Sequence, residues 1–578
     1  MKDIKDEVVL QHIDYNLYDF IKNHTTYKDT DEVFSYAGIT YDYKRFRDLV
    51  DKLIRILSSI PYLKPGDKVV IGLVTCPESI ALVYACNYVS LTPIMVDVRL
   101  SPMEYKRIIT EADSKLAFLA DISSRNLKLI CEAPCLKDLY IVTPIQSAAF
   151  LKRFFWGVVA FSMGFRYFFT SIHKEKVSYW KKFLARDPGE KAAPEFTKGN
   201  ADTPIIFATS GSTGERKFVI QTSRALNLNI YYNEYYFDFS DPSITTSLTF
   251  LPVFALAGFA SSIHFPLFYG KKVYIYQIYD FRRISREIMH LRPNMIIGSV
   301  GMWEHFLHSD LISADTDLSF LRFCLFAGEK CEPEHIENMN KILKDHGCSE
   351  KLLQVYGMTE LTVISMYTPE NYNPASAGKP FPMVDVRIVK EGTNEELPAG
   401  QAGEICVNSV GMMKGYWLND QASAKMLQVH PNGKTYLHTG DLGYIDEEGY
   451  IYINGRIKNM HVSISGTKIF TPDLEAEVQK MDGIASCAAV VCKTSDRNDI
   501  TGIILFVELT EDSLLKKNTD HKVKVYCHDN VSMFLRPDKV IVLDKMPLTS
   551  SGKIDYQDLQ KQADSYMLKY KPTKINVK

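Results

Sequence analysis

Helix-like and strand-like segments alternate in the first part of the chain, and this alternation limits the fold more than any other feature. Tyr43 to Ile60 and Glu78 to Val89 predict helices, whereas Lys68 to Leu73 and Thr92 to Val96 predict strands. The same alternation returns from Ser247 through Phe326, with predicted strands at Lys272 to Ile275, Met295 to Ile297 and Phe323 to Phe326. Such alternation is typical of parallel sheets covered by helices, so we expect an α/β fold.

A loop rich in hydroxyls and glycine follows another predicted strand, Ile205 to Ala208. Gly211 and Gly214 permit tight curvature, and the loop amides and hydroxyls can bind phosphate oxygens. The residues that we expect to hold a polyphosphate are Thr209, Ser210, Gly211, Ser212, Thr213, Gly214 and Lys217, with Arg216 adding charge. Gly214 is followed by Glu215 rather than by Lys-Ser/Thr, so the loop is not a Walker A motif. Thr222 and Ser223 predict the start of the next helix.

Further motifs follow in a fixed order: Tyr356-Gly357-Met358-Thr359-Glu360, Thr439-Gly440-Asp441, Gly455-Arg456 and Ser551-Gly552-Lys553. Each motif alone is also compatible with a turn or a helix N-cap, for example a helix that begins at Thr359. Together with the loop, the series resembles the adenylate-forming superfamily of acyl-CoA synthetases, peptide-synthetase adenylation domains and luciferases. The resemblance extends from about Tyr41 to about Leu559.

The composition is that of an ordered globular protein, with 578 residues of which 46% are apolar. The 67 basic and 69 acidic side chains give a net charge of -2, which argues against nucleic acid as a partner. The 11 cysteines are scattered without a zinc-site spacing and fit a reducing compartment. Met1 to Leu10 is charged and has no apolar secretory segment, so we expect a cytoplasmic protein.

Residues 148–183 are crowded with aromatic and basic side chains and look like an insertion relative to the family pattern. The apolar piece from Phe154 to Phe165 is shorter than the roughly 20 residues of a spanning helix. One interpretation is an interfacial helix that gives peripheral membrane contact, with basic residues at the headgroups. The other is a helix that packs on its own domain or closes an acyl tunnel.

The resemblance implies two domains and a mobile joint between them. A large N-terminal AMP-binding domain of stacked mixed sheets and helices, residues 1–457, contains the 148–190 insertion. A small mobile C-terminal α+β domain, residues 458–578, follows, and Lys458 falls at the hinge position.

The resemblance also implies roles for the motif residues. Thr359 binds the α-phosphate of ATP and Glu360 holds Mg²⁺, a hard cation that accepts carboxylate ligands. Tyr356 stacks on adenine, Gly357 is among the nucleotide-binding residues, and Gly328, Glu329 and Lys330 line the other side of the base. Asp441 accepts hydrogen bonds from the ribose hydroxyls, and Arg456 binds the same sugar or a phosphate.

Lys553 is expected to be the catalytic lysine of adenylate formation, because a flexible cation on a glycine-bearing loop can reach between carboxylate and phosphate. Gly466 matches the glycine beside the pantetheine arm of the incoming thiol. The chain has one residue more than the usual pattern between Gly455 and Gly466, and His461 with Val462 replaces a common Ile-Lys pair. These departures weaken any assignment of CoA in particular.

The expected acyl pocket combines the segment Phe254, Ala255 and Leu256 with Ser299 and Gly301. A buried ammonium group would need a carboxylate partner, which this segment lacks, so an apolar acid such as a fatty acid is favoured over an amino acid. The expected product is an acyl-adenylate, whose acyl group passes to CoA or to a phosphopantetheine-bearing carrier protein. The alternatives are a lactone-forming synthetase that acts on a β-hydroxy acid, and a non-catalytic protein that binds nucleotide or membrane.

Overall fold

The structure is a computed structural model. It describes residues 6–24, 27–121, 127–143, 176–189, 196–209, 217–236, 239, 241–276, 280–328, 331–368, 371–457, 460–462, 468–493, 500–531, 535–549 and 552–569. The chain forms two compact units. The first contains Met1–Thr209, Lys217–Val386 and Val407–Leu437, and the second contains Ser210–Arg216, Arg387–Cys406 and His438–Lys578. Lys458 lies outside the described residues, so the expected hinge there stays a prediction.

The first unit contains an 8-stranded sheet in the order β19-β9-β8-β4-β3-β5-β6-β7. Its strands are β3 (Lys68–Gly72), β4 (Thr92–Met95), β5 (Leu116–Ala120), β6 (Asp138–Val142), β7 (Val177–Tyr179), β8 (Pro204–Ala208), β9 (Phe218–Thr222) and β19 (Gly415–Tyr416). The run from β8 to β7 is parallel, whereas β9 is antiparallel to both of its neighbours. The predicted strands at 68–73, 92–96 and 205–208 are confirmed within one or two residues.

A second, 9-stranded sheet has the order β16-β15-β14-β13-β12-β10-β11-β1-β2. Its strands are β1 (Glu32–Tyr36), β2 (Ile39–Asp42), β10 (Thr246–Thr249), β11 (Lys272–Ile275), β12 (Met295–Gly298), β13 (Phe323–Ala327), β14 (Leu352–Met358), β15 (Thr362–Met366) and β16 (Lys379–Pro380). The central strands from β1 to β14 are parallel. The predicted parallel α/β architecture is therefore confirmed.

Helices cover these two sheets and fill the layer between them. They are α1 (Asp6–His12), α2 (Leu17–His24), α3 (Tyr43–Ser59), α4 (Pro77–Tyr88), α5 (Pro102–Glu111), α6 (Leu127–Cys131), α8 (Trp180–Leu184), α9 (Ser223–Tyr236), α10 (Leu256–Phe259), a π-helix (Ala260–His264), α11 (Phe265–Phe268), α12 (Phe281–Leu291), α13 (Val300–Leu307), α14 (Pro333–Asp345) and α15 (Asp420–Met426). Helix α4 is buried along nearly its whole length, and one hydrophobic core joins it to strands of both sheets. A helix that is apolar all round belongs in such a layer.

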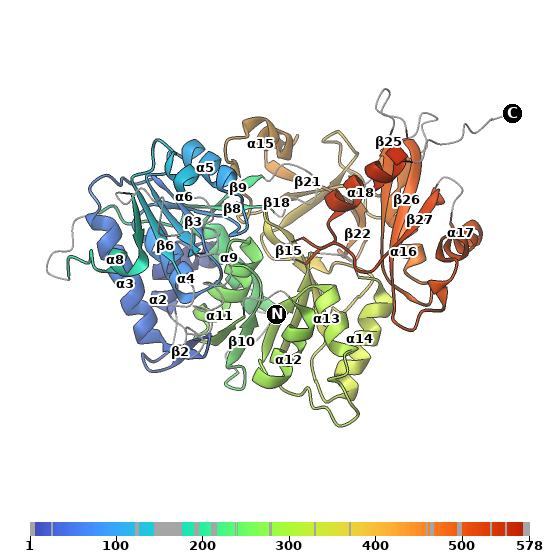
Figure 1. Cartoon of the computed structure of the whole chain (residues 1–578), viewed down its shortest axis with the longest axis horizontal. Helices are drawn as coiled ribbons and strands as arrows, with labels where there is room; N and C mark the ends of the chain where they lie inside the picture. The colour runs from blue at the N-terminus through green and yellow to red at the C-terminus, as the bar shows by residue number, and fades with distance from the viewer. Residues whose placement is uncertain are drawn as a thin grey trace. The chain divides into compact units, whose positions relative to one another are not determined.

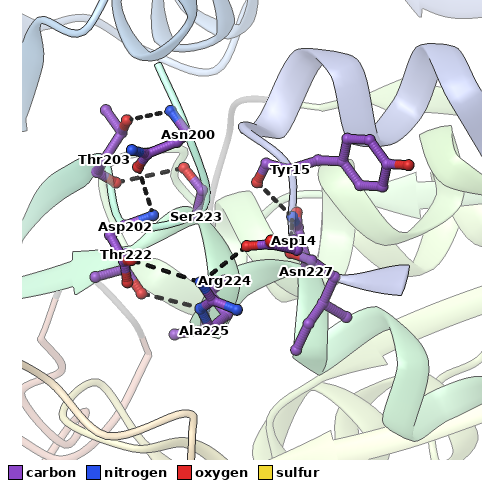
Figure 2. Close-up of polar contacts among 11 residues, drawn as sticks. Asp14, Tyr15, Asn200, Asp202, Thr203, Thr222, Ser223, Arg224, Ala225 and Asn227 are labelled. Atoms are coloured by element: carbon purple, nitrogen blue, oxygen red, sulfur yellow. Dashed lines mark hydrogen bonds and ion pairs between the residues drawn. The ribbon is translucent and has the colours of Figure 1, made fainter. Parts of the chain in front are cut away.

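The start of helix α9 is fixed by side-chain hydrogen bonds that Figure 2 shows. The Thr222 hydroxyl accepts a hydrogen bond from the Ala225 amide at 3.3 Å, which confirms the predicted cap. Asn227 donates from its side-chain amide to the carbonyl oxygen of Tyr15 at 3.0 Å. Strand β9 lies between this helix and the predicted polyphosphate-binding loop, residues 209–217, which is called the phosphate loop below, so this loop joins two antiparallel strands.

The described end of the aromatic segment agrees with one of its two interpretations, a helix that packs on its own domain. Trp180 and Phe183 of α8 are 3% and 0% exposed and pack against Phe118 and Tyr140 of the first sheet. They lie three residues apart on one helix face, which points into the core rather than toward lipid. Residues 144–175 lie outside the described part of the chain, so membrane contact through them stays a prediction. Within the described helices, none is both long and apolar enough to cross a membrane.

A 5-stranded sheet has the order β17-β18-β21-β20 with β22 paired to β21. Its strands are β17 (Asp385–Val389), β18 (Gly403–Asn408), β20 (Leu427–Val429), β21 (Thr435–Ile445) and β22 (Ile451–Arg456). A short two-stranded pair, β23 (Met460–Val462) and β24 (Lys468–Phe470), follows in the chain. The long strand β21 matters most for function, because it contains the Thr439-Gly440-Asp441 motif.

The C-terminal part of the second unit is a three-stranded sheet with helices on both faces (Figure 1, red). Its elements are β25 (Ile484–Lys493), β26 (Ile500–Leu509), β27 (Lys539–Leu543), α16 (Thr471–Val478), a 3₁₀ turn (Leu514–Lys516), α17 (Thr519–Asn530) and α18 (Tyr556–Lys569). Cys487, Ala489 and Val491 of β25 share a core with α16 and α17, whereas the intervening residues share a core with α18. This alternation follows from the period of two in a strand, and the predicted α+β arrangement is confirmed.

All 11 cysteines are free thiols, and ten of them are buried. Most of the cysteines are therefore interior side chains.

Candidate active site

Hydrogen bonds at the edge of the first unit's sheet hold the two ends of the phosphate loop together. The Thr209 amide donates to the Lys217 carbonyl oxygen at 2.8 Å, and the Lys217 amide donates to the Thr209 hydroxyl at 3.2 Å. Strands β8 and β9 pair from Ala208 and Phe218 onward, which fixes where the loop leaves the sheet. Ser210, Gly211, Ser212, Thr213 and Gly214 lie outside the described residues, so their phosphate contacts stay predictions.

Thr359 and Glu360 occupy the turn between the antiparallel strands β14 and β15. The alternative of a helix that begins at Thr359 is therefore wrong. Gln221 donates to the Thr359 carbonyl oxygen at 2.9 Å, and the Met413 amide donates to the Glu360 carbonyl oxygen at 2.8 Å. The turn is thus held from strand β9 and from the segment before β19.

Glu360 is only 8% exposed, and its carboxylate has a specific partner. The Tyr416 hydroxyl donates to Oε1 of Glu360 at 2.7 Å. The Nζ atom of Lys217 lies 4.6 Å from the centre of the Tyr416 ring. The structure therefore brings together a phosphate-loop cation and the predicted metal ligand around one tyrosine, which the sequence analysis did not single out.

Tyr356 and Gly328 lie at the ends of neighbouring parallel strands. Ala327, the last residue of β13, pairs with Val355 of β14, so Gly328 leaves the sheet next to Tyr356, which is still paired with Ser365 of β15. Tyr356 is 8% exposed and Gly328 is exposed. Glu329 and Lys330 fall outside the described residues. Polar groups beyond the carboxyl ends of parallel strands are where α/β sheets bind ligands.

Gly357 is required by close backbone packing. A Cβ atom at this position would lie 2.2 Å from the carbonyl oxygen of Thr362 on the paired strand. A regular strand contact cannot accommodate that distance, and the pairing shifts register between Tyr356 and Gly357. The glycine therefore sets the local bend that places the Thr359–Glu360 turn.

The predicted acyl-pocket residues follow two adjacent parallel strands. Strand β10 precedes the segment with Phe254, Ala255 and Leu256, and strand β12 precedes Ser299 and Gly301. Phe254 is 9% and Leu256 is 6% exposed. The Ser299 hydroxyl caps helix α13 by accepting a hydrogen bond from the Met302 amide at 3.2 Å. Its main role in the described contacts is thus structural, and a pocket role for these residues stays a prediction.

In the second unit, Asp441 and Arg456 face each other across strands β21 and β22. Nε of Arg456 lies 2.7 Å from Oδ1 of Asp441, and the carboxylate is almost fully buried. The Asp441 amide also donates to the Thr439 hydroxyl at 3.0 Å. The two predicted ribose residues are therefore brought together, with the aspartate oriented by both the arginine and its own strand.

Glu404 adds a second carboxylate to this region, which the sequence analysis missed. Its Oε2 lies 2.9 Å from Nδ1 of His438, and its Oε1 accepts a hydrogen bond from the Gly440 amide at 3.1 Å. Glu404 thereby holds the part of strand β21 that leads into Asp441. A glutamate in an apolar strand is the only sequence signal that could have indicated it.

Lys553 lies at the end of a tight turn in the second unit. The Thr549 amide donates to the Lys553 carbonyl oxygen at 2.7 Å, and Leu548 forms a bridge with Ile554. Gly552 has φ of +81°, a conformation that favours glycine. The predicted glycine-bearing loop is thus present, whereas Gly466 lies outside the described residues.

The exit of this turn is anchored by a buried carboxyl group. Tyr556, the first residue of α18, donates from its hydroxyl to the Glu475 carboxylate at 3.0 Å, and the Ala489 amide donates to the same group at 2.7 Å. Burial raises the pKa of Glu475 to about 7, although both hydrogen bonds favour its charged form.

Comparison with known proteins extends over most of the chain. The profile of the AMP-binding enzyme family matches residues 21–417, and that of the AMP-binding enzyme C-terminal domain matches residues 473–553. The long-chain-fatty-acid–CoA ligase of Escherichia coli O6:H1 is 27% identical over 368 residues, which are 63% of this chain and 62% of that protein. The peroxisomal OPC-8:0-CoA ligase 1 of Arabidopsis thaliana is 27% identical over 63% of this chain and 65% of that protein.

The chain thus matches less than two thirds of the length of these two relatives. Among solved structures, ATP-bound MatB from Rhodopseudomonas palustris superposes with a TM-score of 0.76 at 20% identity, over 95% of this chain and 99% of that one. This similarity confirms the fold over nearly the whole chain.

Proposed function

The chain belongs to the AMP-binding enzyme family, and we propose that it uses ATP to convert an apolar carboxylic acid into an acyl-adenylate, whose acyl group then passes to a thiol. The observation that carries this proposal is the grouping of Lys217, Glu360 and Tyr416 at the phosphate loop. A cation and a buried carboxylate at such a loop suit a metal-bound polyphosphate.

In the first half-reaction, a carboxylate oxygen of the acid attacks the α-phosphorus of ATP. The bond from that phosphorus to the bridging oxygen breaks, and pyrophosphate leaves with the electron pair. Two anions must meet, so the protein supplies alignment and positive charge rather than an acid or a base. We assign the α-phosphate to Thr359, the ribose to Asp441 and Arg456, and the developing charge to Lys553.

The described residues fit a Mg²⁺ ion at Glu360. This carboxylate is buried and is presented on a turn. Its hydrogen bond with Tyr416 uses Oε1, so that among the contacts of the described residues Oε2 is available as a ligand atom. When bound, the ion offsets negative charge on the phosphates. Oxygen ligands of this kind suit a hard cation and not a soft metal.

In the second half-reaction, the sulfur of a thiolate attacks the acyl carbonyl carbon, the bond from that carbon to the phosphate oxygen breaks, and AMP leaves. CoA and the phosphopantetheine arm of a carrier protein offer the same thiol. The E. coli and Arabidopsis relatives are both named as CoA ligases, which favours CoA. The predicted contact of the thiol arm with Gly466 belongs to this step.

For the acid, we propose an apolar chain such as that of a fatty acid. Residues 250–259, which contain Phe254, Ala255 and Leu256, carry no charged side chain. A substrate ammonium group would find no carboxylate partner in this segment, and its burial there would be unfavourable. The name of the E. coli relative, a long-chain-fatty-acid ligase, agrees with this choice.

The test is acid-dependent exchange between ATP and labelled pyrophosphate, run with acetate, medium-chain, long-chain, aromatic, β-hydroxy and amino acids. Exchange with apolar acids, followed by AMP release that requires CoA or a loaded carrier protein, is the expected result. Exchange with a β-hydroxy acid and turnover without thiol would instead support the lactone-forming alternative. Nucleotide binding without exchange for any acid would support a non-catalytic role and contradict the proposal.

A further inference from the structure

Within the first unit, Tyr416 contacts two charged residues of the predicted site, Glu360 and Lys217. Its hydroxyl donates to Oε1 of Glu360 at 2.7 Å, and its ring lies 4.6 Å below Nζ of Lys217. The tyrosine is 3% exposed and the glutamate 8%, so the hydrogen bond is shielded from water. A shielded bond between a neutral donor and a carboxylate is directional and holds its acceptor in place.

The position of the Tyr416 ring is fixed by its backbone. Strand β19 pairs with β9, so that Tyr416 lies opposite Val219. The Trp417 amide donates to the Phe218 carbonyl oxygen at 2.7 Å. The Tyr416 amide donates to the Ser423 hydroxyl at 2.8 Å. Because β9 begins directly after Lys217, the same pairing places the ring beside the end of the phosphate loop.

The segment just before β19 also holds the backbone of the Glu360 turn. The Met413 amide donates to the Glu360 carbonyl oxygen at 2.8 Å, and the Lys414 amide donates to the Ile220 carbonyl oxygen at 2.9 Å. Five consecutive residues, 413–417, therefore join the Glu360 turn to the strand that follows the phosphate loop. A shift of either part would be transmitted to the other through this segment.

Resting on the proposed function, we propose that Tyr416 is a positioning residue that couples the phosphate loop to the metal ligand. Its hydroxyl holds the Glu360 carboxylate so that Oε2 is presented to Mg²⁺, because the terminal torsion of a glutamate is otherwise broad. Its ring face holds the Lys217 ammonium beside the same carboxylate. The hydroxyl therefore governs metal affinity, and the ring governs nucleotide affinity.

The hydroxyl and the ring are separated by two substitutions. Tyr416→Phe removes only the hydroxyl, and Tyr416→Leu removes the ring as well. Removal of a group that orients a metal ligand typically lowers metal affinity by about 10- to 100-fold. We expect Tyr416→Phe to lower the affinity for Mn²⁺, used as a probe for Mg²⁺, by about tenfold. The nucleotide affinity at saturating metal should change little. Tyr416→Leu should bind the nucleotide about tenfold more weakly than Tyr416→Phe does.

Tyr436→Phe is the matched control. Tyr436 is also fully buried in the first unit, and its hydroxyl donates to a carboxylate, Oδ2 of Asp385, at 2.6 Å. The control therefore loses the same type of hydrogen bond at a site without a proposed role. A purely structural role for Tyr416 predicts that both Phe variants lower the melting temperature and that neither changes the metal dependence.

Mn²⁺ binding is measured by electron paramagnetic resonance on the full chain with a non-hydrolysable ATP analogue, and the Mg²⁺ dependence of pyrophosphate exchange is measured in parallel. Weaker Mn²⁺ binding in Tyr416→Phe but not in Tyr436→Phe supports the coupling. Equal Mn²⁺ affinity in the wild type and Tyr416→Phe overturns it, and equal nucleotide affinity in the Phe and Leu variants overturns the role of the ring. A wild type that binds the nucleotide but exchanges with no acid contradicts the proposed function alone, because the Mn²⁺ comparison remains valid.

Discussion

Glu475 should make the three-stranded sheet of the second unit less stable as the pH rises from 5 to 8. Its carboxyl group lies between helix α16, strand β25 and the start of helix α18, and its partners are the Ala489 amide and the Tyr556 hydroxyl. Both partners are neutral, so no opposite charge offsets the loss of water around the carboxylate. Burial therefore dominates and raises the pKa of Glu475 from 4.5 to about 7.

The sign of the effect follows from linkage. The folded state binds the proton more tightly than the unfolded chain, so the stabilisation is complete below the unfolded pKa of 4.5 and is lost as the pH rises through about 7. One pKa unit corresponds to about 1.4 kcal/mol, so the shift sets an upper limit of about 3 kcal/mol. Because the Glu475 side chain is not fully shielded from solvent, we expect a loss of about 2 kcal/mol.

Glu475→Gln tests this reasoning, since glutamine retains a carbonyl oxygen for both donors and cannot ionise. At pH 8 the variant should be more stable than the wild type, with amide exchange in peptides of β25 and β26 slower by about 30-fold, which is about 2 kcal/mol. At pH 5 the difference in exchange rate between the variant and the wild type should be only a small fraction of the difference at pH 8. Comparing both proteins at the same pH cancels the intrinsic pH dependence of exchange.

Glu477→Gln is the matched control on the same helix. Hydrogen bonding to Lys480 at 2.9 Å lowers the pKa of Glu477, so its ionised form stabilises the fold. The control should therefore leave exchange unchanged or make it faster at pH 8. A Glu475→Gln variant that is less stable than the wild type at pH 8, or equally different at both pH values, would refute the argument from burial.

Three further predictions concern the candidate site. Lys553→Ala should slow single-turnover adenylation by about 10²- to 10³-fold with nearly normal ATP binding, and an unchanged rate would contradict its assignment. Asp441→Asn should raise the KM for ATP in pyrophosphate exchange by about tenfold or more, because it removes a charged acceptor; an unchanged KM would remove it from the ribose site. Gly357→Ala should destabilise the first unit by about 1 to 3 kcal/mol in urea unfolding, because its Cβ meets the Thr362 carbonyl oxygen at 2.2 Å, and wild-type stability would show that the turn relaxes freely.

The parallel strands could be predicted because buried runs such as Met295 to Ile297 are short, apolar and bounded by turn residues. Strand β9 could not be predicted in the same way. It has five residues, and its outer neighbour is the two-residue strand β19, almost two hundred positions later in the chain. Pairing over that separation leaves no local pattern, so the sequence indicates no element for residues 218–221, between the loop and the predicted helix start.

The same long-range pairing explains which site residues were found. Thr359, Glu360, Asp441 and Lys553 belong to local motifs, whose residue types indicate their chemistry without a partner. Tyr416 has no such motif, and it becomes informative only when pairing with β9 places it between two charged groups.

For a related reason, the sequence leaves two interpretations of the aromatic segment open. Trp180 and Phe183 flank Lys181 and Lys182, a composition that fits either a lipid surface or an amphipathic helix on a core. Composition alone does not distinguish between a membrane and the protein's own sheet. In the described part of the segment, Phe183 packs against aromatic residues of β5 and β6 and therefore belongs to the protein core.

Each unit surrounds its own predicted site carboxylate with local partners. The net charge of -2 gives the protein no overall field to attract a polyanion. The carboxylate of Glu360 is instead bonded to Tyr416, whose ring contacts Lys217, and the carboxylate of Asp441 is paired with Arg456. Buried carboxylates need such partners, because an isolated buried charge is strongly unfavourable. Under the proposed function, a bound nucleotide exchanges these contacts for contacts with its own phosphate and ribose oxygens. Contacts between these side chains and the contacts that they would make with ATP are both short-range, so salt screens them little. We therefore expect ATP affinity to depend far more on these side chains than on ionic strength.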